Sequence, residues 1–486
     1  MSTTQVNTPT SRLRLGYARR DITPPVGIYH RMWGAARHDA ATGVHRPLHI
    51  DVLILEPLGG NPDERHVRVQ TDFVHLNNEQ REALVAPVAA AASVPAERVV
   101  VTHSHSHSAG FFEANRQSMP GGHLIAPYLQ DVSQRAAEAT GEALANLADA
   151  SISYGVGRCD MASNRDYWDT ENGLYTTGHN PDRTIENRLS VARVTDGDGA
   201  LRLLIVHYAC HPTTLAWDNT LISPDFVGAL REVVEADQDA PCCFFQAPCG
   251  DLGPREGFVG DTDVADRNGK QVGHAALSVL YGMGLPQHDF AYAGPVISGA
   301  TIGTWTWRAH GEERQQQSAR FSAAYSTVDL PLIALPSAEQ LQTQLAELTR
   351  AQEQADEQGD PIAARDLGAR AERCRRWLGR ISRLPEGGTF PFHFSLHVLG
   401  DAVWVTTGAE PYSWLAEALR RRFPALFLLI SPIAGDTQVA YLLTRDSYGT
   451  GLYQQEPSSL DQGCLEQLID ALTEEIAELT GHAPIY

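Results

Sequence analysis

Three histidines at alternate positions, His103, His105 and His107, follow an apolar run in the segment VVVTHSHSHSAGFF, residues 99–112. Side chains two positions apart on an extended segment point to the same side, so three imidazoles can face one partner together. Neutral imidazole is the commonest metal ligand in proteins. The segment fits one wall of a metal site, and its spacing alone fits a solvated polar loop equally well.

Two more metal-capable side chains follow apolar runs of the same kind. His211 lies beyond LLIVHYAC and before the helix-like VGALREVVEA, and Glu410 lies between VWVTTGA and the helix-like WLAEAL. Open α/β sheets hold their ligands at the carboxyl ends of strands. Three such loops favour the metal site, although His211 alone also fits a core or capping histidine and Glu410 alone a first-turn carboxylate.

A fourth loop of this type, PCGDLGPREG, covers residues 248–257 and places glycines around Asp251. Such glycines suit a tight turn beside a ligand, but they are also common in ordinary turns. Cys249 has a nucleophilic side chain, yet no histidine is paired with it in a recognisable pattern. The sequence also contains no GxSxG, HExxH, P-loop or strand-to-helix GxGxxG motif.

The elements that must position these loops alternate between apolar β-rich runs and helical stretches, which predicts an α/β fold with layers. We expect residues 1–12 to form a disordered tail and residues 13–486 to form one catalytic domain. Residues 337–382 are rich in Ala, Glu, Gln, Leu and Arg and contain a Gly-Asp-Pro break at 359–361. This composition predicts a helical hairpin inserted into the domain.

The charge balance, 38 Lys plus Arg against 59 Asp plus Glu, gives a formal net charge of -21. This charge repels phosphate backbones, so nucleic acid is not expected as a partner. The seven cysteines show no CxxC spacing, which favours free thiols in a reducing compartment. No apolar segment reaches the roughly 18 residues of a membrane span. We expect a cytoplasmic protein that acts on a small molecule, and homo-oligomer formation stays open.

Ordered blocks over most of the chain resemble the neutral (non-lysosomal) ceramidase family of zinc amidohydrolases. GYARRDITPPVGIYHRMWGAA and TGVHRPLHIDVLIL resemble its N-terminal blocks, and VTHSHSHSAGFF resembles its histidine block. SNRDYW, YACHPTT, GAEPYSW and YLLTRDSYGTGLY resemble later blocks in the same order. The resemblance implies a layered mixed α/β catalytic domain of the neutral ceramidase type.

The same blocks imply a site when they are matched residue by residue, with His107 as an extra histidine at a glycine position. The implied zinc ligands are His103, His211, Glu410 and Tyr441; the implied catalytic residues are His105, Arg165 and Tyr453; the expected substrate-side residues are His107, Asp251 and Gly253. A mixed imidazole, carboxylate and phenolate set suits several metals, so zinc rests on the resemblance.

Two departures from the family pattern bear on the substrate. Gly253 stands where the family has a catalytically important serine, and the chain ends without the immunoglobulin-like C-terminal domain of true ceramidases. We therefore expect metal-bound hydroxide to attack an amide or related bond of a small polar substrate, rather than ceramide. The alternatives are a ceramidase-like N-acylsphingosine amidohydrolase and a non-catalytic binding module that retains the metal.

Overall fold

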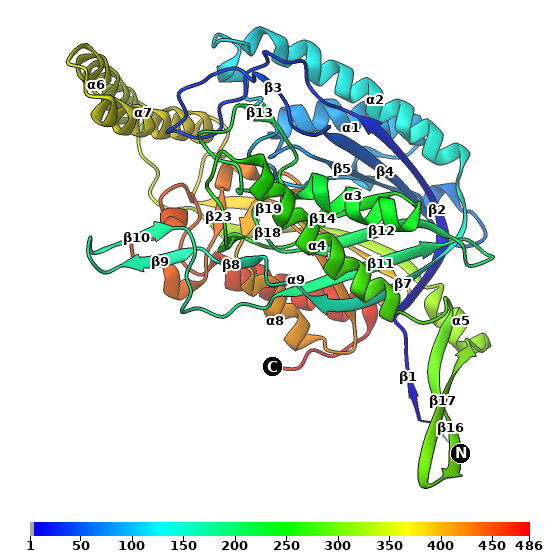
Figure 1. Cartoon of the computed structure of the whole chain (residues 1–486). Helices are drawn as coiled ribbons and strands as arrows, with labels where there is room; N and C mark the ends of the chain where they lie inside the picture. Colours follow the sequence, from blue (N-terminus) through cyan, green and yellow to red (C-terminus); the bar gives the residue numbers. More distant parts are fainter. Residues whose placement is uncertain (1–3) are drawn as a thin grey trace.

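The computed structural model describes residues 4–486 and contains two sheets that pack against each other (Figure 1). The larger sheet contains, in spatial order, β14 (Cys242–Gln246), β12 (Leu201–Tyr208), β11 (Arg188–Thr195), β7 (Ala148–Arg158), β2 (Thr10–Asp21), β4 (His49–Glu56), β5 (His66–Thr71) and β6 (Val99–His103). The smaller sheet contains β18 (Phe321–Pro331), β19 (Thr389–Leu399), β20 (Ala402–Thr407) and β22 (Phe427–Ser431).

Helices cover the outer face of each sheet. Over the larger sheet lie α1 (Asn78–Ala92), α2 (Ile125–Ala145), α3 (Phe226–Gln238) and α4 (Thr262–Gly282), and over the smaller sheet lie α8 (Trp414–Arg422) and α9 (Cys464–Thr480). Side-chain alternation on β4 produces these layers: Ile50, Val52 and Ile54 pack with α1 and α2, whereas Leu53 and Leu55 face the smaller sheet. The predicted layered α/β fold is confirmed.

Short paired strands tie loops together at the ends of the two sheets. These pairs are β3 (Gly43–Val44) with β13 (Leu221–Ile222), β8 (Ala162–Asn164) with β15 (Leu252–Pro254), β9 (Asp166–Asp169) with β10 (Leu174–Thr177), and β21 (Glu410–Pro411) with β23 (Tyr441–Leu442). Two of the pairs contain residues of the predicted site, so backbone hydrogen bonds hold those residues in place. Within residues 4–486, no helix is long and apolar enough to cross a membrane.

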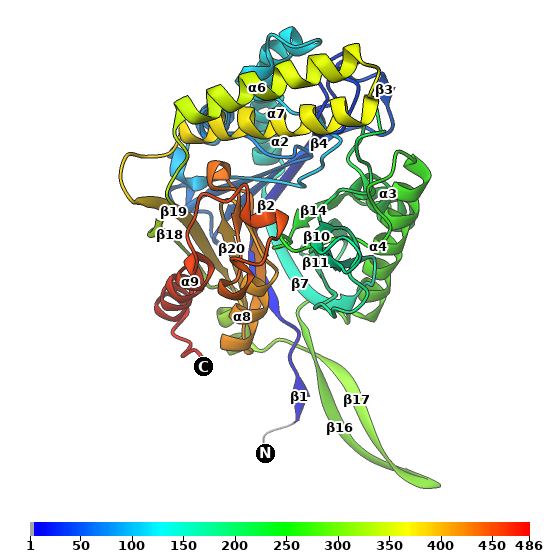
Figure 2. The ribbon, with the colours of Figure 1, turned by 90° about the vertical axis from the view of Figure 1, so that its left-hand side faces the viewer.

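A hairpin of two helices, α6 (Ala338–Glu357) and α7 (Pro361–Ile381), occupies the range in which the composition predicts it. Figure 2 shows it lying across one end of the molecule. Ser337 caps α6 with a capping box, and Asp360 caps α7 ahead of Pro361 at the first helical position. Gly359 takes a φ of 69°, the left-handed conformation that the tight turn between the helices requires.

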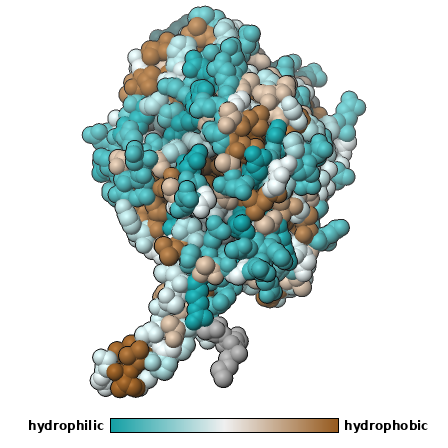
Figure 3. Space-filling model, turned by 90° about the vertical axis from the view of Figure 1, so that its right-hand side faces the viewer, coloured by the Kyte–Doolittle hydropathy of each residue, from teal (hydrophilic) through white to brown (hydrophobic). Residues whose placement is uncertain are grey.

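A long arm formed by β16 (His288–Ser298) and β17 (Ala300–Ala309) projects from the body, followed by the short helix α5 (Glu312–Ser318). Val296 and Ile297 are exposed at its apolar tip (Figure 3). β1 (Gln5–Val6) pairs with β16, and β2 begins to pair with β7 at Thr10. Strand pairing therefore begins inside the range 1–12 predicted as a tail, and residues 1–3 of that range lie outside the described part.

Candidate metal centre

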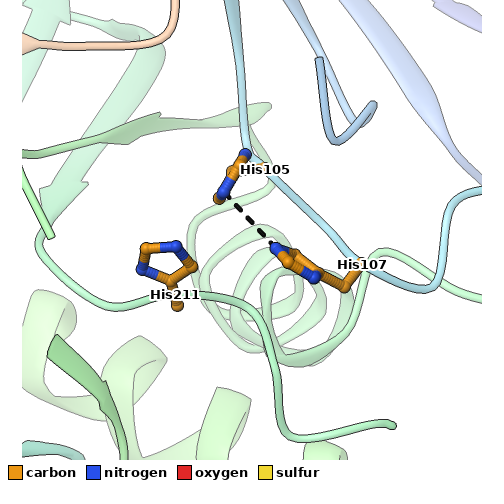
Figure 4. Close-up of side chains that lie close together, drawn as sticks. All are labelled: His105, His107 and His211. Atoms are coloured by element: carbon orange, nitrogen blue, oxygen red, sulfur yellow. Dashed lines mark hydrogen bonds between the residues drawn. The ribbon is translucent and has the colours of Figure 1, made fainter. Parts of the chain in front are cut away.

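Three histidines from two distant loops converge at one end of the larger sheet. His105 and His107 follow β6, and His211 follows β12. The sheet curls so that β14, the neighbour of β12, approaches β5 and β6, which brings the two loops together. A ring nitrogen of each histidine lies within 4.8 Å of those of the other two (Figure 4). This spacing suits a metal ion.

Backbone carbonyls orient two of the imidazoles. Nδ1 of His105 donates to the Val74 carbonyl at 2.6 Å, and Nδ1 of His211 donates to the Cys249 carbonyl at 2.7 Å. These bonds fix the tautomer and leave each Nε2 free as a lone-pair donor toward the centre, as outer partners of metal-binding histidines do. His105 also has a φ of 70°, a left-handed conformation that is strained for a residue with a side chain.

Two oxygen donors reach the same place through the pairing of β21 with β23, in which Glu410 lies opposite Tyr441. Oε2 of Glu410 lies 3.0 Å from Nε2 of His211 and 3.3 Å from Nε2 of His105. The Tyr441 hydroxyl accepts a hydrogen bond from Nη2 of Arg165 at 3.2 Å. Burial, followed by the Glu410 charge, raises the pKa of that hydroxyl well above its usual value.

Electrostatics give these side chains the protonation states that a cation needs. Burial lowers the pKa of His107 well below its usual value, and burial with the nearby Arg165 lowers the pKa of His211 to about 3. Burial by itself raises the pKa of Glu410, but His105 and His211 outweigh it and hold the pKa well below the usual range. The neutral imidazoles of His107 and His211 beside an ionised carboxylate fit a divalent metal, and nitrogen with oxygen ligands is a common zinc set.

The structure places His103 outside the group of His105, His107 and His211, and its role as a ligand stays a prediction. Its Nδ1 lies 2.7 Å from the Thr71 hydroxyl, and its ring stacks on Phe73. The expected ligand role of His103 came from the family resemblance, and in the structure β6 ends at His103 and the backbone turns at His105. The pair that enters the centre is therefore shifted by two residues, to His105 and His107.

Asp251 and Gly253 are predicted to lie against the substrate, and the structure shows a supporting contact for Asp251. The Asp251 carboxylate accepts hydrogen bonds from the Ser413 backbone N–H at 2.7 Å and hydroxyl at 2.9 Å, which fixes the chain just after Glu410. A Cβ atom added at Gly253 would lie 3.6 Å from Cδ of Arg165 and 3.8 Å from the Thr213 hydroxyl, an ordinary contact. Neither residue is among those that line the adjoining cavity in the described chain.

A cavity of about 490 Å³ opens onto the centre. Its floor includes His105, His107, Glu410, Tyr441 and Arg165, and Nη2 of Arg165 donates to the Gly250 carbonyl at 2.7 Å. Tyr453 lies at the rim, 45% exposed, with its ring 6.2 Å from that of Tyr441. The predicted residues that surround the cavity are thus His105, His107, Arg165, Glu410, Tyr441 and Tyr453.

Helix α7 supplies a cavity wall that sequence reasoning missed. Arg373, Arg376 and Arg380 line the cavity from this helix, and Arg383 lines it from just beyond the end of the helix. Their spacing of three to four residues was the available signal, because residues so spaced share a helix face. Four aromatic residues elsewhere in the wall had no such signal, since they come from separate loops: Trp33, Phe111, Trp217 and Phe258.

Comparison with known proteins agrees with this geometry. The family model for the neutral/alkaline non-lysosomal ceramidase N-terminal region matches residues 13–273. The structure of neutral ceramidase from Pseudomonas aeruginosa is 16% identical, with a TM-score of 0.66, and the match covers 99% of this chain and 76% of that one. A ceramidase complexed with C2 is also 16% identical, with a TM-score of 0.65 over 99% of this chain and 77% of that one. At this identity, the two structures show a shared fold.

No curated protein sequence matches the chain. The matched segment spans more than half of the sequence, and the chain therefore belongs to the neutral/alkaline non-lysosomal ceramidase family, a family of zinc-dependent amidohydrolases.

Proposed function

We propose that the chain is a zinc-dependent hydrolase that cleaves an amide or a related bond of a small polar substrate. The observation that carries this proposal is the convergence of His105, His107, His211 and the ionised Glu410 beside a cavity, onto which His105, His107 and Glu410 open. We assign His105, His211 and Glu410 as the main ligands, because catalytic zinc commonly has three protein ligands. Tyr441, opposite Glu410 in the β21–β23 pair, adds a phenol oxygen beside them.

A zinc ion held by these residues would polarise the substrate carbonyl and lower the pKa of a coordinated water molecule. His107, with Nε2 3.4 Å from Nε2 of His105, takes a proton from the attacking water and passes it to the leaving group. The Tyr453 hydroxyl at the cavity rim donates a hydrogen bond to the carbonyl oxygen as negative charge develops there. Arg165, anchored on the Gly250 carbonyl, keeps Tyr441 in place.

Two features support a substrate other than ceramide. Gly253 offers no hydroxyl beside Arg165 and Thr213, where an added Cβ atom would make only ordinary contacts. The cavity wall also carries the arginines of α7, and two hydrocarbon chains would leave those charges poorly solvated.

The second candidate function is hydrolysis of N-acylsphingosine, and the aromatic part of the cavity favours it. Trp33, Phe111, Trp217 and Phe258 give an acyl chain an apolar surface. A non-catalytic binding module is less consistent with the strained backbone of His105, because such strain is typical of sites where geometry is under functional demand.

The cysteines support our proposal of a cytoplasmic location. All seven are free and buried in the part of the chain that the structure describes. Free thiols persist in reducing compartments, whereas oxidising compartments favour disulfides.

Hydrolysis of a panel of N-acyl compounds by zinc-loaded protein tests the proposed function. We expect product release by the parent, at least a hundredfold less by Glu410→Gln, and an unchanged rate in Glu347→Gln, an exposed position on α6. Short-chain fluorescent ceramide in the same panel tests the second candidate. Zinc-loaded parent protein that releases no product from any compound would contradict the hydrolase proposal, and an equal rate in Glu410→Gln would contradict the ligand assignment.

A further inference from the structure

The cavity beside the metal centre is more positive than the molecule that contains it. The chain has a formal net charge of -21, yet arginines outnumber acidic residues among the side chains that line this cavity. The lining arginines are Arg116, Arg165, Arg373, Arg376, Arg380 and Arg383, and the lining acidic residues are Glu113, Glu372, Glu410 and Glu456. Such a local excess of one sign concentrates ligands of the opposite charge.

Each of the four glutamates already has cationic or imidazole partners. The pairs are Glu113 with Arg383 at 3.0 Å, Glu372 with Arg116 at 3.0 Å and with Arg376 at 3.0 Å, Glu456 with Arg373 at 3.2 Å, and Glu410 with the imidazoles of the metal centre. Two arginines remain without a carboxylate. Arg165 is committed to the Gly250 carbonyl and Tyr441, which leaves Arg380.

Arg380 has no ion pair and no side-chain hydrogen bond within residues 4–486. Its guanidinium lies 5.7 Å from the Trp377 ring, and its side chain lines the cavity. Burial, followed by the charge of Arg376, lowers its pKa below the usual value, and the carboxylates of Glu456 and Glu410 only partly oppose this. Arg380 and Glu410 line the same cavity. The guanidinium nitrogens of Arg380 are not among the buried polar atoms that lack a partner in residues 4–486, so water in the cavity reaches them and an anion can take the place of that water.

We propose that Arg380 binds a carboxylate of the substrate, so that the site takes a small amide carrying both a carboxylate and an apolar group, as an N-acylated apolar amino acid does. The planar guanidinium matches a carboxylate with two parallel hydrogen bonds. Trp33, Phe111, Trp217 and Phe258 provide the apolar wall for the other group, and about 490 Å³ accommodates a molecule of this size. This inference rests on the proposed hydrolase function.

Binding of a matched pair of probes tests the role of Arg380 without turnover. The probes are 3-phenylpropanoate and the neutral 3-phenylpropanol, which contain no amide bond to hydrolyse, titrated by calorimetry into the zinc-loaded full chain. We expect the parent to bind the acid about tenfold to a hundredfold more tightly than the alcohol, the range of a charge-assisted hydrogen bond. In Arg380→Gln that ratio falls to about one. Arg380→Lys keeps part of it, because a point charge remains.

Arg370→Gln is the matched control, since Arg370 is an exposed arginine on the same helix and is not among the residues that line the cavity. It should keep the full ratio. Equal affinities in the parent would overturn the proposal. A ratio that persists in folded Arg380→Gln would also overturn it, because the carboxylate would then bind at the metal or at another arginine. If Arg380→Gln fails to fold, Arg380→Lys becomes the test. A ratio of acid affinity to alcohol affinity equal to that of the parent would then overturn the role of the planar guanidinium.

Hydrolysis of N-acetylphenylalanine and of neutral N-acyl amides separates this inference from the proposed function. A preference for the acid in binding, with no product from any amide, would refute the hydrolase and leave the assignment of Arg380 standing. Hydrolysis of neutral amides without any preference for the acid would refute the assignment of Arg380 and leave the hydrolase standing.

Discussion

Substitution of His103 or His105 by glutamine separates two assignments of the metal ligands that differ by two residues. In the structure, His105 has Nε2 beside Glu410, whereas His103 contacts Thr71 and Phe73. We expect the parent and His103→Gln to show the same increase in Tm on addition of zinc. His105→Gln should show little increase, because a nitrogen donor is lost.

The size of the effect follows from ligand linkage. Free zinc at about 100 times its Kd adds about 2.7 kcal/mol to the free energy of unfolding. For 486 residues, an unfolding entropy of about 2.1 cal/mol/K per residue gives about 1 kcal/mol/K, so Tm rises by roughly 3 °C. A hundredfold weaker affinity in His105→Gln reduces the contribution to about 0.4 kcal/mol. His103→Gln loses about 1 to 2 kcal/mol from its buried contacts with or without zinc.

Differential scanning calorimetry with and without zinc, beside metal content by mass spectrometry, measures both quantities. Because the comparison is between two increases in Tm, it is independent of the intrinsic destabilisation of either variant. The opposite pattern, an increase lost in His103→Gln and kept in His105→Gln, would refute the assignment made from the structure.

Three further predictions address the surroundings of the centre. Gly253→Ser should fold normally, because the added Cβ meets only ordinary contacts. The variant should hydrolyse short-chain ceramide faster, relative to small polar amides, than the parent does. An unchanged ratio of these two rates would mean that the glycine does not select the substrate. Asp251→Asn should weaken zinc binding by about tenfold to a hundredfold, because an amide cannot accept both hydrogen bonds from Ser413. Competition with a chelator measures the zinc affinity. An unchanged affinity would show that the contact between Asp251 and Ser413 is dispensable. Burial raises the pKa of Asp166 to about 6, above an unfolded value of about 3.9. The folded state therefore binds more protons between these values, and stability falls by up to about 3 kcal/mol as pH rises through the window. Asp166→Asn should lack this contribution in urea unfolding between pH 4 and 7, and identical pH dependence of the parent and the variant would refute it.

Local pattern predicted the layers of the fold, and the family resemblance predicted a minority of the side chains that line the cavity. Apolar runs and helical stretches show their period in the sequence, so the sheets and the α6–α7 hairpin were accessible to prediction. The identity of the ligand histidines was less accessible, because the rule that alternate side chains share a face holds only while a strand continues. The turn at His105 ends that regularity, and nothing in HSHSH marks it.

Contacts between distant segments explain what the sequence did not reveal. The charged wall over the cavity arises where α7 meets loops that contain Arg116 and Glu456, a juxtaposition fixed by the packing of the hairpin on the body. The contact between Asp251 and Ser413 likewise joins loops of different sheets. Residue types indicated that these side chains could bind or support something, and only the tertiary structure shows which partner each one has.

The histidine run has a consequence for how the chain acquires its fold. His105, His211 and Glu410 are far apart in sequence, and their loops meet only after both sheets have formed and packed. Such non-local contacts form slowly. Before they form, His103, His105 and His107 lie within five consecutive residues, close enough for the unfolded chain to chelate zinc by itself. Zinc bound in that way stabilises the unfolded state and subtracts from the stability gained by the native centre. Excess zinc during refolding therefore competes with the structure that finally holds the metal.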